Sequence, residues 1–346
     1  MSVNSIDIVD GIRQLYCEKI NTISSFSKQS KGTRQWLRED SNIYPQSIID
    51  SDAIEIITYT PEKPLECVAY DIQRLSCASL ETMSSLCTSI NNDKFLAWQL
   101  IQMYYAAFYA AHSILKICGL GLTQIDNTII NNLKSNGKKR NIITPAINAG
   151  IYCVDINRNN HYMVIYKVNK YDDSHRGLWA RFIDLLNIIN GSTIRTDDYN
   201  SACVRPKQSN DSLSYSIWEQ YPNPDAQLVF NRISSLLDLL NQNSRNWLSS
   251  IRNNVNYSQQ YGVWFPYKNI IKNYKDILGS KKIYMQSPLC DEFQFGNKPE
   301  LIQYIKACHF IVSLNREIVI DLSKRHPESR SFLKNNAIRL INQYAK

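Results

Sequence analysis

Apolar residues recur at helical spacing over most of the chain. They repeat every three or four positions from Val3 to Phe26, Leu65 to Ser89, Leu178 to Ile189 and Ala226 to Leu240. Further helices are expected over 245–257, 299–322 and 329–344. Because an apolar face with this period is typical of an amphipathic helix, the pattern predicts a mainly α-helical protein.

The stretch from Phe95 to Leu122 is apolar on nearly every side and rich in alanine and aromatic residues. A helix that is hydrophobic all round is buried, so we expect this segment to be the central helix of a bundle. Gly119 and Gly121 predict its end. Its longest apolar run is shorter than the roughly 20 residues that a bilayer requires, so no membrane association is expected.

Two short segments favour strands instead. Ala53–Thr60 and His161–Val168 are rich in β-branched and aromatic residues and alternate in part, as strands do. Ser135–Asn141 is basic and contains a glycine, and Ser192–Asp225 is polar with three prolines, so both are expected to be loops. The predicted fold class is a helical bundle with short β additions and long loop insertions.

The same pattern suggests three regions. Residues 1–90 would form an N-terminal helical region with a short strand. Residues 91–275 would form the helical core, with a polar insertion around 135–225. Residues 276–346 would form C-terminal helices that pack on this core. The polar tract at 91–94 sets the first boundary, because such a tract ends one helix and caps the next.

Charge and cysteine usage narrow the possible partners and cofactors. The net charge of +8 is compatible with a polyanionic partner such as nucleic acid. The nine cysteines occur singly with no CxxC pair, which argues against a zinc cluster and against a secreted disulfide framework. There is no phosphate-binding glycine loop, GxSxG or HExxH motif. We therefore expect a cytoplasmic protein without metal or cofactor.

Two segments resemble a known family. MYYAAFYAAHSILKICG (103–119) and IRNNVNY (251–257) are similar to two core helices of the HEPN superfamily, helical-bundle proteins of prokaryotic toxin–antitoxin and antiphage systems. The motif of the second helix is an arginine, a polar residue and a histidine five positions after the arginine. Arg252 and Asn253 match the first two, and Tyr257 occupies the histidine position.

The resemblance implies metal-independent RNA cleavage at a site shared across a dimer, with Arg252, Asn253 and Tyr257 as catalytic residues. In such a site an imidazole takes the 2′-hydroxyl proton and a guanidinium stabilises charge on the attacked phosphate. A tyrosine has a reference pKa of about 10 and is mostly protonated at pH 7. A non-catalytic scaffold of a multi-protein defence complex is therefore the alternative.

Five further residues are candidates to contact substrate. They are Lys138, Lys139, Arg140, Asn256 and His112. The basic run can instead be a solvated loop, and His112 a buried core histidine. Arg252 and Asn253 can likewise bond backbone carbonyls or cap a loop. The expected partners are RNA, a second copy of the chain, or a protein encoded nearby.

A second polar cluster contains Asp172, Asp173 and His175. Carboxylates beside a histidine can bind a metal or act as acid and base, so a metal-dependent enzyme is a third possibility. Aspartate before a helix is also a typical N-cap, and this simpler interpretation is favoured for the cluster.

Overall fold

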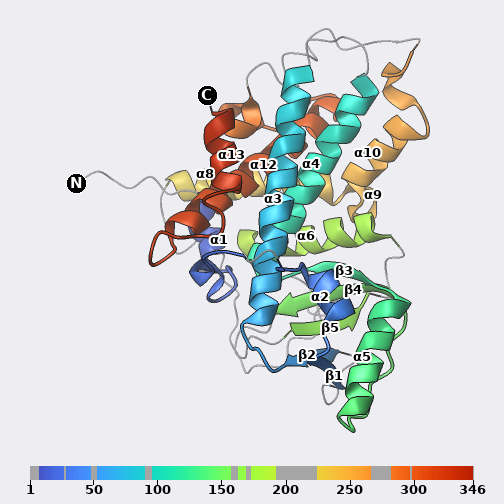
Figure 1. Ribbon diagram of the computed structural model, residues 1–346. Helices are drawn as coiled ribbons and strands as arrows, with labels where there is room; N and C mark the ends of the chain where they lie inside the picture. The colour runs from blue at the N-terminus through green and yellow to red at the C-terminus, as the bar shows by residue number, and fades with distance from the viewer. Residues whose placement is uncertain are drawn as a thin grey trace.

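The computed structural model spans residues 1–346 and describes residues 8–26, 29–47, 53–89, 96–156, 163–168, 173–191, 224–265, 282–296 and 298–345. Within these ranges the protein is mainly α-helical and has one five-stranded sheet. Figure 1 shows most of the helices gathered in one part of the molecule and the sheet, with α2 and α5, at its other end. The predicted class, mainly α with short β additions, is confirmed.

Three long helices form the centre of the helical part: α3 (Lys63–Ser89), α4 (Leu96–Ile117) and α12 (Glu300–Lys324). Both α3 and α12 pack against α4 (Figure 1). Ala106 and Ala110 of α4 are fully buried, and small side chains in a close-packed interior let neighbouring helices approach. The prediction of a central buried helix within 95–122 is therefore confirmed.

Shorter helices surround this centre. They are α1 (Ile8–Arg13), α6 (Ser174–Asn190), α8 (Pro224–Leu240), α9 (Gln242–Arg245), α10 (Trp247–Asn256) and α13 (Ala337–Tyr344), with 3-10 turns at Ile20–Thr22, Gln260–Gly262, Ile283–Met285 and Asp291–Phe293. Helices α6 and α10 both pack on α4, and both also contact α8.

The sheet has the strand order β1-β2-β5-β4-β3, and all neighbouring strands are antiparallel. The strands are β1 (Ile43–Ser47), β2 (Ile54–Thr58), β3 (Leu122–Ile125), β4 (Gly150–Ile156) and β5 (Met163–Lys167). In β2, Ile54 and Ile56 are buried while Glu55 between them is partly exposed, the alternation expected of a pleated strand. Because β1 and β2 belong to the predicted region 1–90 and the other strands to 91–275, these two regions share one sheet.

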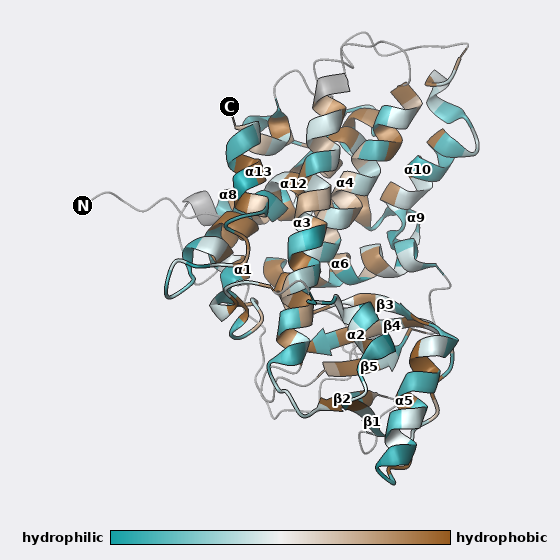
Figure 2. Cartoon of the chain, viewed as in Figure 1, coloured by the Kyte–Doolittle hydropathy of each residue, from teal (hydrophilic) through white to brown (hydrophobic). Residues whose placement is uncertain are grey.

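Two helices flank the sheet, α2 (Thr33–Glu39) and α5 (Asn127–Lys139). They pack on each other, and α5 also contacts β1. Hydrophobic and hydrophilic residues alternate along α5 in Figure 2, as expected of a helix with one buried face.

A partly buried ion pair joins the sheet to the helical part. Arg181 of α6 is 5% exposed and donates to both carboxylate oxygens of Asp155 in β4. The same guanidinium donates to the hydroxyl of Tyr166 in β5, at 2.5 Å. Charge-assisted bonds of this kind are stronger than neutral ones, so they fix α6 across the end of the sheet.

One loop prediction is wrong. Most of the basic segment Ser135–Asn141 continues helix α5. Asp126 caps the start of this helix by accepting from the backbone N–H of Ile129, at 3.1 Å. Gly137, the main reason to expect a loop, lies inside the helix where Thr144 comes close. A Cβ atom at position 137 would lie 2.6 Å from the Thr144 hydroxyl oxygen.

Two helix predictions are wrong in extent. In the segment 3–26 the described residues contain only α1 and a 3-10 turn. The backbone N–H of Cys17 donates to the carbonyl of Ile117, at 2.7 Å, which ties the chain to the end of α4. The C-terminal helix expected over 329–344 begins at Ala337. The long polar loop is predicted at Ser192–Asp225, and residues 192–223 of this segment lie outside the described ranges.

The strand predictions at 53–60 and 161–168 correspond to β2 and β5 and are confirmed. Among the described residues no helix is long and apolar enough to cross a bilayer. The eight described cysteines form no disulfide bond, and Cys203 lies outside the described ranges.

Candidate functional site

The predicted arginine lies in a buried position between two helices. Arg252 is on α10 and is 7% exposed. Its guanidinium carbon lies 5.1 Å from the centre of the Tyr104 ring on α4. Among the described residues its Nε atom has no hydrogen-bond partner. The arginine of the predicted motif therefore faces the aromatic–alanine helix, as a cation over an aromatic ring.

The hydroxyl of Tyr104 connects three helices. It lies 2.9 Å from Nδ1 of His175 on α6 and 2.8 Å from the hydroxyl of Ser249 on α10, and the indole Nε1 of Trp179 donates to it at 3.0 Å. Tyr104, Ser249 and Trp179 are buried, and His175 is partly exposed. Helices α6 and α10 both pack on α4 (Figure 1), and this hydroxyl is a polar group shared by all three.

The protons in this cluster are constrained. The Trp179 indole can only donate, so the Tyr104 hydroxyl gives its single proton either to His175 or to Ser249. Burial and the positive charge of Arg252 lower the pKa of His175, which keeps the imidazole neutral at pH 7. Burial raises the pKa of Tyr104, so its hydroxyl keeps its proton. A neutral imidazole next to a guanidinium is an arrangement suited to proton transfer beside an anion.

Phe108 separates His175 from a second histidine. Its ring centre lies 4.5 Å from that of His175 and 4.8 Å from that of His112, which is one helical turn along α4. Burial, aided by the charge of Lys116, lowers the pKa of His112 to about 3. His112 is therefore neutral at physiological pH and packs against an aromatic ring.

The structure does not bring Tyr257 to the guanidinium. Tyr257 follows the last residue of α10 and is 72% exposed, while Arg252 is buried. At about 100° per residue, five positions turn the helix by about 140° from the starting face, so the two side chains leave α10 in different directions. Asn253 and Asn256 are partly exposed, and the Asn253 carbonyl accepts from the Tyr257 N–H at 2.8 Å.

The basic run lies elsewhere. Lys138 and Lys139 end α5, and Arg140 follows them. The Arg140 guanidinium lies 5.0 Å from the ring centre of Tyr44 and 4.3 Å from that of Tyr59. In Figure 1 this end of α5 is beside β1 and β2, at the opposite end of the molecule from α10. The basic residues therefore do not share a site with Arg252.

Of the two interpretations of the acidic cluster, capping is confirmed for Asp173. Its Oδ1 accepts from the backbone N–H of His175 at 3.0 Å, at the start of α6. No group of three His, Cys, Asp or Glu side chains suited to a metal occurs within the described residues. Asp172 lies outside them.

Tyr104, Trp179 and Ser249 are the members of the cluster that the sequence analysis did not single out. Tyr104 was assigned only to the core. A buried tyrosine usually finds a partner for its hydroxyl, so a tyrosine within such an apolar helix is a usable signal for a polar site.

No family model, no curated protein and no solved structure matches this chain.

Proposed function

We propose that this protein binds and cleaves RNA without a metal ion, at a site where His175 faces the substrate. The observation that supports this proposal is the contact of His175 with the same tyrosine that lies under Arg252. The resemblance to the HEPN superfamily implies the same chemistry. His175, which lies on a different helix, would act as the base in place of the motif histidine, whose position Tyr257 occupies.

In this proposal the neutral imidazole of His175 removes the proton from a 2′-hydroxyl group. The 2′-oxygen attacks the adjacent phosphorus, and the bond to the 5′-oxygen breaks as that oxygen takes up a proton. Arg252 is too buried to be the first contact of a strand, but its charge acts through low-dielectric surroundings on the phosphate that gains negative charge. Tyr104 orients the imidazole.

The experiment is to incubate the purified full chain with transfer RNA and total RNA in EDTA. We expect cleavage products that end in a 2′,3′-cyclic phosphate. The variant His175→Asn should lose cleavage by a factor of about 100 or more, the usual contribution of a general base. The matched control is Tyr257→Phe, which should cleave like the wild type, because this exposed hydroxyl lies on another face of α10.

Two results contradict the proposal. RNA that stays intact and unbound, both in EDTA and with added divalent metal, excludes it. Cleavage that is lost in Tyr257→Phe but kept in His175→Asn excludes His175 as the base and returns the role to the motif position.

A non-catalytic scaffold is the second candidate, and the burial of Arg252 favours it. A guanidinium that is 7% exposed and lies over an aromatic ring can act as a structural clamp between α4 and α10. This candidate predicts stable co-purification with a protein encoded nearby, unchanged in His175→Asn. It also predicts that Tyr257→His gains no RNA cleavage.

A further inference from the structure

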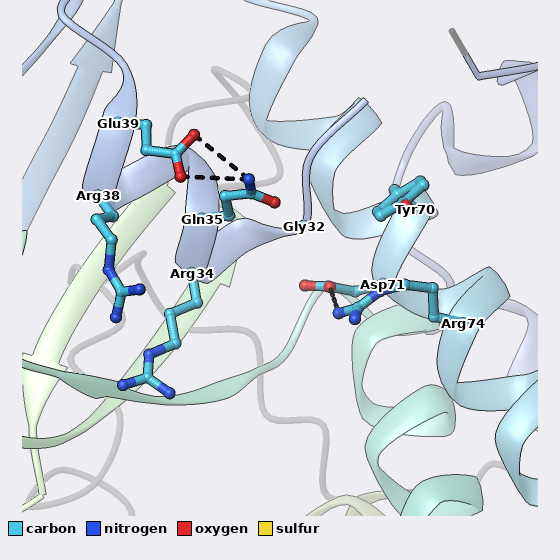
Figure 3. A pocket seen from close by; sticks show the side chains of 8 residues that line it. All are labelled: Gly32, Arg34, Gln35, Arg38, Glu39, Tyr70, Asp71 and Arg74. Carbon is cyan, nitrogen blue, oxygen red and sulfur yellow. Dashed lines mark hydrogen bonds and ion pairs between the residues drawn. The ribbon is translucent and has the colours of Figure 1, made fainter. Parts of the chain in front are cut away.

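A cleft of about 500 Å³ opens between α2 and α3, near the junction of the sheet and the helical part. It is lined by Gly32, Arg34, Gln35, Arg38, Glu39, Tyr70, Asp71 and Arg74. Figure 3 shows Arg34 and Arg38 projecting from α2 in the same direction and Arg74 extending from α3. The volume falls in the range of about 300–1,000 Å³ that is typical of small-molecule sites.

The three guanidinium groups are accessible. The side chains of Arg34, Arg38 and Arg74 are 48%, 40% and 58% exposed. Arg34 and Arg38 both donate through Nη2 to the same oxygen, Oδ2 of Asp126, at 3.1 and 2.6 Å. A guanidinium carries five N–H donors. A single shared carboxylate oxygen therefore leaves this pair able to bind a second anion.

Both acidic groups in the wall of the cleft are already paired with cations, Glu39 with Lys31 and Asp71 with two partners. Asp71 accepts from the backbone N–H of Thr33 at 3.0 Å, and it forms ion pairs with Lys116 at 3.0 Å and Arg74 at 2.7 Å. Burial raises the pKa of Asp71, but these cations and hydrogen bonds outweigh it and bring the value to about 2. Gly32 makes this packing possible, because a Cβ atom there would overlap the Asp71 carboxylate.

The charges around the cleft do not cancel. Five cationic side chains, Lys31, Arg34, Arg38, Arg74 and Lys116, form ion pairs with only three carboxylates, Glu39, Asp71 and Asp126. Within the described residues of these pairs, two positive charges are left in excess. An excess of one sign in a concave surface raises the local concentration of ions of the opposite sign.

We propose that this cleft binds a small phosphorylated ligand of nucleotide size. Arginine forks match the geometry of phosphate oxygens and bind them in pairs. The partly exposed ring of Tyr70 lies in the same wall, 5.5 Å from the Arg74 guanidinium carbon, and offers an aromatic surface to a nucleobase. The site is separate from the Tyr104 cluster, so this inference does not depend on the proposed RNA cleavage.

The test is isothermal titration of the full chain with AMP, ATP, pyrophosphate and adenosine. AMP and ATP should bind and adenosine should not. In Arg34→Ala/Arg38→Ala the dissociation constant should rise about tenfold or more, as expected for the loss of charge-assisted bonds. Arg330→Ala is the matched control, because Arg330 is 76% exposed, pairs with Glu328 and does not line the cleft. It should bind like the wild type.

Thermal melting of each variant separates lost binding from lost folding. If the double alanine variant does not fold, Arg74→Gln decides the test, since it keeps a polar side chain at an exposed position and removes one charge. Absence of AMP and ATP binding at millimolar concentration overturns the proposal. The proposal is also overturned if Arg330→Ala weakens nucleotide binding as much as the cleft variants do, or if adenosine binds as tightly as AMP. Binding of RNA without binding of any nucleotide overturns it as well.

Discussion

The guanidinium carbon of Arg252 lies 5.1 Å from the centre of the Tyr104 ring, and both side chains are buried. The tyrosine is on the central helix and the arginine on the helix that packs against it. The hydroxyl of the same ring lies 2.9 Å from Nδ1 of His175. One aromatic side chain thus connects a buried cation to a partly exposed imidazole.

Replacing this buried cation should reveal whether its charge or its volume matters for folding. Arg252→Ala leaves a cavity beneath Tyr104, and we expect a loss of about 2–5 kcal/mol in the free energy of unfolding, as for large-to-small core changes. Arg252→Met fills most of the volume without a buried charge and should lie within about 1.5 kcal/mol of the wild type. Urea unfolding followed by circular dichroism measures both. Equal losses for the two variants would show that the cation itself is required.

Removal of the Tyr104 hydroxyl should cost stability through the partners it leaves behind. In Tyr104→Phe the buried Trp179 indole and Ser249 hydroxyl lose their common partner, and an unsatisfied buried group costs about 1–3 kcal/mol. If the Tyr104 hydroxyl and its partners act together, Ser249→Ala should cost less stability in the Tyr104→Phe background than in the wild type. The reason is that the effects of substitutions at contacting residues do not simply add. The measurement is a double-mutant cycle of unfolding free energies. Strict additivity would show that the Tyr104 and Ser249 hydroxyls act independently.

The central helix could be predicted because its apolar residues extend around all sides, which leaves few alternatives to burial. Arg252 facing α4 was also predictable from the paired segments. The sequence could not identify His175 as its neighbour, since α6 reaches Tyr104 only through the packing of separate helices on α4. The basic loop was a wrong prediction because Gly137 is tolerated inside α5 for a tertiary reason, the close approach of Thr144.

The His112 ring should make the protein less stable in mild acid. Its folded pKa of about 3 is below the usual value near 6.5. The neutral ring therefore stabilises the fold above pH 6.5, and this contribution is lost progressively as the pH falls toward 3. Between pH 6.5 and pH 5 we expect a loss of about 1–2 kcal/mol from this residue. Unfolding free energies at the two pH values should differ less in His112→Asn. An unchanged difference would assign the acid sensitivity to other groups.

Asp71 should govern stability at lower pH. Its folded pKa of about 2 is below the usual value near 3.8, so its contribution is present above pH 4 and is lost as the pH falls toward 2. That contribution is about 2 kcal/mol by linkage. At pH 7, Asp71→Asn leaves the Lys116 ammonium buried without its carboxylate, and we expect a loss of about 3–5 kcal/mol. Asp71→Asn/Lys116→Met removes both charges and should recover much of it. Unfolding in urea at pH 7 and pH 3 measures the set. If the double variant is no more stable than Asp71→Asn, then the unpaired Lys116 charge is not the source of the loss, and Asp71 supports the fold through its other contacts, the Thr33 N–H and Arg74.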